Sequence, residues 1–78
     1  PPIFGKQGEA ISNYETLVQQ QEASGATKPE YAQTYVFLGN LYEQQGKADK
    51  AQEIWKRGQT AFPDNAEIKK KIEGANRR

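Results

Sequence analysis

Apolar residues recur along the central part of the chain at the spacing of amphipathic helices. In residues 29–45 they stand three or four positions apart and share one helix face: Tyr31, Tyr35, Leu38 and Tyr42. A second set with this spacing follows Gly46: Ala51, Ile54, Trp55, Gly58 and Phe62. Gly46 is expected to end the first helix in the left-handed conformation that glycine tolerates. The pattern predicts two antiparallel helices over residues 29–62.

Weaker patterns flank this pair on both sides. Residues 7–23 predict an amphipathic helix with the apolar positions Ala10, Ile11, Tyr14, Leu17 and Val18. Pro63 is expected to stop the second central helix, and Asp64 to cap a further helix over residues 64–75. This last helix has only a thin apolar line: Ile68, Ile72 and Ala75. The predicted fold class is all-α, with about four helices in a single domain of residues 1–78.

Small residues stand where the helices are expected to touch. Gly39 and Ala51 lie beside the two central stripes and would let the helix backbones approach. Gly58 lies inside the second central helix, where glycine costs about 1 kcal/mol relative to alanine. The expected reason is close approach of the last helix, and alanine should then be tolerated at this position. Trp55 is expected to fill the centre of the core.

Seven of these positions follow the pattern of a known repeat: Tyr35, Leu38, Gly39, Tyr42, Ala51, Trp55 and Pro63. Residues 32–65 therefore resemble one complete 34-residue tetratricopeptide repeat. The usual tryptophan and the later aromatic residue have exchanged places, as Tyr35 and Trp55. Gly58 stands where the family usually keeps alanine. The resemblance implies antiparallel helix pairs stacked as a solenoid.

The N-terminal part echoes the second helix of the complete repeat. Four residues lie 41 positions before Gly46, Lys47, Ala51 and Trp55, and they are Gly5, Lys6, Ala10 and Tyr14. Residues 7–23 thus resemble the second helix of a preceding, partial repeat, and the echo of Gly46 indicates a helix turn at Gly5. The excess over 34 residues is placed between residues 19 and 29. Residues 64–75 resemble the polar helix that caps such arrays.

The resemblance also implies a function. First helices of these repeats line a concave groove that takes an extended peptide or a partner helix, which implies a non-catalytic scaffold for protein–protein interaction. The implied groove positions are Gln33, Val36, Phe37, Asn40, Glu43 and Gln44. Asn40 stands out because a carboxamide can bond both the donor and the acceptor of a ligand backbone. Val36 and Phe37 either pack against the helix of residues 7–23 or contact the ligand.

One specialisation of the family is not expected. Co-chaperone members hold a C-terminal carboxylate with basic or amide side chains where Gln33 and Phe37 stand, and the charges are absent here. The next first-helix equivalent offers Glu67 and Lys71, which supply at most one basic group.

Composition excludes several kinds of chemistry. The chain has no cysteine and no histidine, which removes thiolate metal sites, cysteine nucleophiles and the usual general base. Ser12 and Ser24 cannot form a serine hydrolase triad without histidine. Carboxylates stand near lysine or arginine at helical spacing, as ordinary surface pairs do. No enzymatic activity, metal or cofactor is predicted.

Basic residues gather towards the C-terminal end although the net charge is only +1: Lys69, Lys70, Lys71, Arg77 and Arg78. Lysines near the end of a helix favour its dipole and solubility, and no aromatic platform for bases adjoins them. We interpret the cluster as a solvated face. Binding of nucleic acid is the less favoured alternative.

Only four residues precede Gly5, so the first helix lacks the helix that would come before it in a complete repeat. With no methionine in the chain, this indicates an excised fragment of a longer protein. The first helix could then bury its apolar face against a second copy, and homo-oligomerisation is the alternative function. The longest apolar run, residues 35–38, is too short for a membrane span or a signal peptide. The chain is expected to be soluble, in the cytoplasm or the periplasm.

Overall fold

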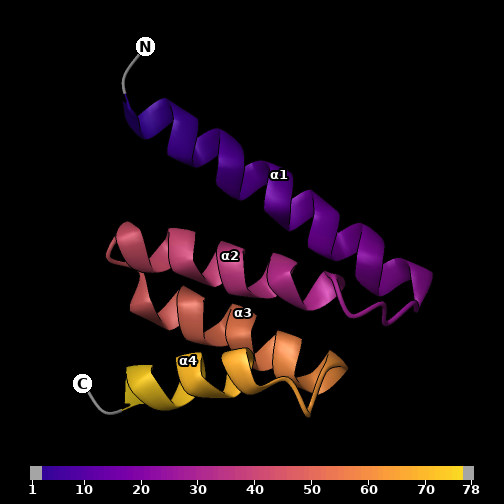
Figure 1. Cartoon of the computed structure of the whole chain (residues 1–78). Coiled ribbons are helices and arrows are strands. Elements are labelled where there is room, and N and C mark those ends of the chain that lie inside the picture. Colours follow the sequence, from indigo (N-terminus) through magenta and orange to yellow (C-terminus); the bar gives the residue numbers. More distant parts are fainter. Residues whose placement is uncertain (1–2, 77–78) are drawn as a thin grey trace.

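Four helices in alternating directions make up the computed structural model, which describes residues 3–76 (Figure 1). The helices are α1 (Ile3–Ser24), α2 (Tyr31–Gln44), α3 (Ala48–Ala61) and α4 (Ala66–Asn76). Helix α1 packs against α2, α2 packs against α3, and α4 contacts both α3 and α2. Residues 3–76 contain no strand. The prediction of an all-α fold is therefore confirmed.

Glycines end the first two helices as their conformational freedom allows. Gly25 and Gly46 have φ values of 72° and 77°, in the left-handed region that side chains with a Cβ disfavour. The Gly46 N–H donates to the carbonyl of Glu43 at 2.9 Å, which satisfies one free carbonyl at the end of α2. The turn expected at Gly46 is confirmed.

Two local predictions about helix starts are wrong. Helix α1 begins at Ile3, so Gly5 lies inside the helix and does not form a turn like that at Gly46. Helix α4 is capped by Asn65 rather than Asp64, because the Ile68 N–H donates to Asn65 Oδ1 at 2.9 Å. Asparagine and aspartate are comparable caps, so the sequence alone did not choose between the two neighbours.

The core lies between α2 and α3, around Trp55. This side chain is only 1% exposed, and its indole Nε1 donates to the carbonyl of Val36 at 3.4 Å. A Cβ at Gly39 would lie 2.0 Å from that same indole nitrogen. The glycine therefore opens the space that the indole ring fills, as the sequence pattern predicted for a close approach of the two helices.

Gly58 has a different close neighbour from the one expected. A Cβ at this position would lie 2.8 Å from both Cβ and Cγ of Tyr35 on α2, and 3.1 Å from Cδ1 of Ile68 on α4. Helix α4 does approach Gly58 as expected, but the tighter contact is with Tyr35 of α2. Because the α2 backbone fixes Tyr35 Cβ and the buried side chain has little room to turn, alanine would not fit without a shift of α2 or α3. The expectation that alanine is tolerated is therefore wrong.

The outer helices attach to this pair through smaller apolar contacts. Ile11 and Val18 of α1 are buried in the core cluster, and Gln21 Nε2 donates to Thr34 Oγ1 of α2 at 3.0 Å. On the other side, Ile68 and Ile72 bury the inner face of α4. Each outer helix buries one side only, as expected for a stacked array of helices.

A polar cluster ties three helices together at the end of α1. Arg57 of α3 donates to Glu22 Oε1 of α1 at 2.6 Å, and the Tyr35 hydroxyl of α2 donates to Glu22 Oε2 at 3.0 Å. The hydrogen bond from Arg57 lowers the pKa of Glu22 below its ordinary value of 4.5. Burial, together with the bond to Glu22, raises the pKa of Tyr35 to about 12. Glu22 is therefore held in its charged form.

Replacing Glu22 with glutamine should have a small effect that depends on pH. A carboxyl whose pKa is lowered by folding stabilises the protein above its unfolded value, near 4.5, and loses that contribution as pH falls through the folded pKa. Arg57 and Glu22 side chains are 42% and 39% exposed, so the loss at neutral pH should stay below about 1 kcal/mol. Thermal unfolding of both proteins over a pH series measures it.

The difference in melting temperature between the two proteins should shrink as the pH falls below 4.5. The exposed Glu9 of α1 provides a control, because Glu9→Gln makes the same chemical change on the same helix. A difference for Glu22→Gln that stays constant over the whole pH series would mean that packing, and not charge, is lost.

Candidate functional site

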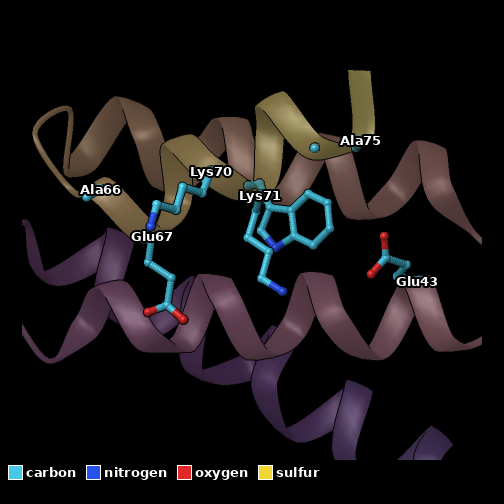
Figure 2. A pocket seen from close by; sticks show the side chains of 8 residues that line it. Glu43, Ala66, Glu67, Lys70, Lys71 and Ala75 are labelled. Carbon is cyan, nitrogen blue, oxygen red and sulfur yellow. The ribbon is translucent and has the colours of Figure 1, made fainter. Parts of the chain in front are cut away.

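A cavity of about 690 Å³ opens between α2 and α4, with the side chain of Trp55 from α3 contributing to its lining. The other lining residues are Glu43, Ala66, Glu67, Lys70, Lys71, Gly74 and Ala75. Figure 2 shows Glu67 and Glu43 at opposite ends of the cavity, with Lys71 between them. The cavity is therefore a groove with two acidic ends and basic side chains along α4. We call it the α2–α4 groove.

Two contacts define the shape of the α2–α4 groove. Gln33 Nε2 of α2 donates to Glu67 Oε1 of α4 at 2.9 Å, which bridges the two helices at the Glu67 end. Lys71 Nζ lies 5.9 Å from the centroid of the Trp55 ring, within the range of a cation–π contact. Both charged side chains are thus positioned by contacts within the protein.

The sequence model of the tetratricopeptide repeat matches residues 5–63, which include most of α1 and all of α2 and α3. The chain belongs to the tetratricopeptide repeat family. Comparison with curated proteins and with solved structures gave no significant match. Proteins of this family typically bind other proteins and are generally non-catalytic.

The repeat explains why α2 and α4 share the groove. Glu67 follows Gln33 by 34 residues, so the hydrogen bond between them joins equivalent positions of successive tetratricopeptide units. In the family, such positions belong to the first helices, which line the concave side. Helix α4 itself lies beyond the residues that the family model matches, so only the 34-residue spacing of Gln33 and Glu67 relates it to a first helix.

The predicted groove residues divide into four groups. Gln33 and Glu43 lie at the α2–α4 groove, through the bond to Glu67 and the cavity lining respectively. Val36 is 1% exposed and belongs to the core, so its side chain does not offer a ligand contact. The reason is the close packing of α2 on its neighbours, which the repeat pattern does not reveal.

Phe37 and Gln44 lie towards α1 instead. The Phe37 ring stands 6.2 Å from the ring of Tyr14 and remains 46% exposed, and Gln44 Oε1 accepts a hydrogen bond of 3.4 Å from Gln7 Nε2. Of the two interpretations of Phe37, packing against α1 is therefore realised through Tyr14. Phe37 is not among the residues that line the α2–α4 groove.

Asn40 is half-buried on the same face of α2 as Gln33, seven residues earlier. Its Oδ1 is buried and has no hydrogen-bond partner among the described residues. A buried acceptor without a partner costs about 1 to 3 kcal/mol. No hydrogen bond from the described residues offsets the cost of burying Asn40 Oδ1.

Sequence reasoning missed the contribution of α4 to the lining. Lys70 and Lys71 belong to the basic cluster that we interpreted as a solvated face, and both line the groove. Arg77 and Arg78, the other members of that cluster, lie outside the described residues. The register of the next first helix had already indicated Glu67 and Lys71, but no sequence pattern marks Lys70 as a lining residue.

Two searches of the described residues bear on other functions. Within residues 3–76, no group of three or more acidic side chains lies close enough together to hold a metal ion. Over the same residues, no helix combines the length and the apolar character needed to cross a bilayer.

Proposed function

We propose that the chain binds an extended peptide or a helix of a partner protein in the α2–α4 groove. The observation that carries this proposal is the cavity of about 690 Å³ between two first-helix positions of a tetratricopeptide repeat protein. Its size suits a short peptide segment, because ligand sites commonly have volumes of about 300 to 1,000 Å³. The charged side chains along it would select the sequence of the partner.

Asn40 supports the same proposal from another direction. Its Oδ1 is buried and has no partner among the described residues, so a rotation of the side chain would be needed to bring this oxygen to the surface. There a backbone N–H of a bound peptide would donate to Oδ1, and Nδ2 would donate to a backbone carbonyl. Such bonds contribute about 1 kcal/mol each and do not depend on the peptide sequence. Asn40 would thus hold the backbone while the groove reads the side chains.

The test begins with a displayed library of random ten-residue peptides, selected on the whole chain and then titrated by calorimetry. Replacing Asn40 with alanine should weaken a selected peptide about fivefold, the equivalent of one hydrogen bond. The variant should be at least as stable as the parent, because it removes a buried acceptor that has no partner among the described residues. Thermal unfolding checks that the weaker binding is not a folding defect.

Asn13→Ala is the matched control, since Asn13 is exposed on α1 and the chemical change is identical. Equal binding by the Asn40 variant and the control would remove the role of Asn40. Failure to select any peptide on the parent protein would contradict the proposed function itself.

A second candidate function is homo-oligomerisation through α1. The face available for it is smaller than the sequence suggested, because Ile11 and Val18 are buried against the chain's own core. Leu17 and Phe37 remain 39% and 46% exposed, and the Tyr14 ring of α1 stands beside the Phe37 ring of α2. These three side chains form the apolar surface that would meet a second copy.

Sedimentation equilibrium from about ten micromolar to about one millimolar decides between the two candidates. A dimer should disappear when Leu17 is replaced by glutamate, which leaves the core untouched because Leu17 is exposed. A monomer at every concentration would exclude the second candidate.

A further inference from the structure

Packing requires glycine at some helical positions of the described residues and not at others. A Cβ at Gly39 or Gly58 would collide with Trp55 or Tyr35, so packing requires both glycines. Gly74 of α4 is different, because a Cβ built there meets no heavy atom within 4 Å. Its φ is not positive either, so it is not a left-handed helix end. Neither packing nor backbone conformation requires glycine at this position.

Glycine at position 74 nevertheless has a cost. Glycine stabilises a helix less than alanine by up to about 1 kcal/mol. Gly74 lies within the last turns of α4, and it lines the α2–α4 groove together with Ala75, Lys71 and Trp55. The space that a side chain would occupy is therefore groove space rather than core space.

We propose that Gly74 leaves room in the α2–α4 groove for one large apolar side chain of a bound peptide. This inference rests on the proposed function, since it assumes that the groove takes a peptide. Ala75 and the methylene stem of Lys71 are apolar neighbours of the space beside Gly74, and the ring of Trp55 is a third although it is only 1% exposed. An apolar side chain placed here would leave water, which is favourable in proportion to the apolar area that it buries.

The charged neighbours limit where this side chain sits. Glu43 closes the groove at the end of α2, and the Lys71 ammonium is held near the Trp55 ring. An aromatic side chain beside Gly74 would find the Lys71 cation within reach of its own ring face. The peptide residues on either side of it would then meet Lys70 and Glu43 (Figure 2).

The experiment compares three proteins in parallel: the parent chain, Gly74→Leu and Gly8→Leu. Gly8 is a matched control because it is a helical glycine of α1 whose Cβ also meets nothing within 4 Å, and it does not line the groove. Both variants should melt no lower than the parent, since leucine favours a helix and neither side chain enters the core. The same displayed library of random ten-residue peptides is selected on all three.

The parent and Gly8→Leu should select peptides that share one large apolar residue. Gly74→Leu should select peptides with a small residue at that place. In titrations, Gly74→Leu should weaken a parent-selected peptide about tenfold or more. It should have little effect on a peptide whose large apolar residue has been changed to alanine, because the leucine then fills the space that the peptide leaves.

Two results would overturn the inference, and they differ in meaning. If peptides bind the parent and Gly74→Leu selects the same ones with the same affinity, Gly74 does not shape the site, while the proposed function stands. If no peptide binds the parent protein, the proposed function fails and this inference fails with it.

Discussion

Replacing Trp55 with alanine is expected to lower the free energy of unfolding by about 3 to 5 kcal/mol. The indole is 1% exposed, fills the space above Gly39 and donates a hydrogen bond to the carbonyl of Val36. Its removal leaves a cavity between α2 and α3 and an acceptor without this partner. Because the stability of small domains starts at roughly 5 kcal/mol, only about 0 to 2 kcal/mol would remain, and a measurable fraction of the molecules should be unfolded at room temperature. Urea unfolding followed by circular dichroism measures the loss.

Phe37→Ala is the control for this prediction. It also removes an aromatic ring, but that ring is 46% exposed and lies outside the core. The cost should therefore stay below about 1.5 kcal/mol. Equal losses for the two variants would show that the α2–α3 interface is not the main source of stability.

Gly39→Ala is the second change with a large expected effect, although it adds a single methyl group. The new Cβ would lie 2.0 Å from Nε1 and 2.4 Å from Cε2 of Trp55, distances that non-bonded atoms do not reach. The indole is only 1% exposed and has little room to shift, so the two helices must move apart. A loss of about 3 kcal/mol or more is expected, at the upper end for overpacked cores. The same urea unfolding experiment applies.

Gly8→Ala separates this steric effect from helix propensity. Both changes replace a helical glycine with alanine, but the Cβ at Gly8 meets nothing within 4 Å. Alanine at position 8 should raise stability by up to about 1 kcal/mol. If Gly39→Ala proved equally stabilising, the close approach of Trp55 to α2 would be contradicted.

The sequence predicted the structure best at positions where only one residue type satisfies the local physical requirement. The left-handed φ at Gly46 and the close approach of the second central helix at Gly39 were predicted from the sequence pattern, since glycine is the residue that meets each demand. That Trp55 is the side chain at Gly39 was not predicted. The apolar stripes predicted the helices because burial on one face requires a helical period. Family membership followed from the same residues.

Predictions failed where two residues satisfy the same requirement. Asp64 and Asn65 are both good caps. Only the geometry of the turn between α3 and α4 decides that the Ile68 N–H donates to Asn65 Oδ1. The neighbour of Gly58 depends on how α2, α3 and α4 pack at once, and a pattern along one helix cannot rank those contacts. The same reason placed Val36 in the core rather than in the groove.

The candidate site was only partly predictable. Gln33 and Glu43 were identified from the position of α2 in the repeat, and the structure places both at the α2–α4 groove. Lys70 and Gly74 were not identified, because α4 has few of the residues that define the repeat pattern and was interpreted as a capping helix. The α2–α4 groove is lined by residues of both helices, and the repeat pattern is weak in the sequence of α4.

The position of Trp55 gives the protein an optical reporter. It is the one tryptophan of the chain, it lines the α2–α4 groove, and Lys71 Nζ stands 5.9 Å from its ring. Indole emission responds to a nearby positive charge, and any occupant that draws the lysine away would change the spectrum. Occupancy of the groove can therefore be followed by intrinsic fluorescence, with unlabelled protein and at concentrations too low for calorimetry.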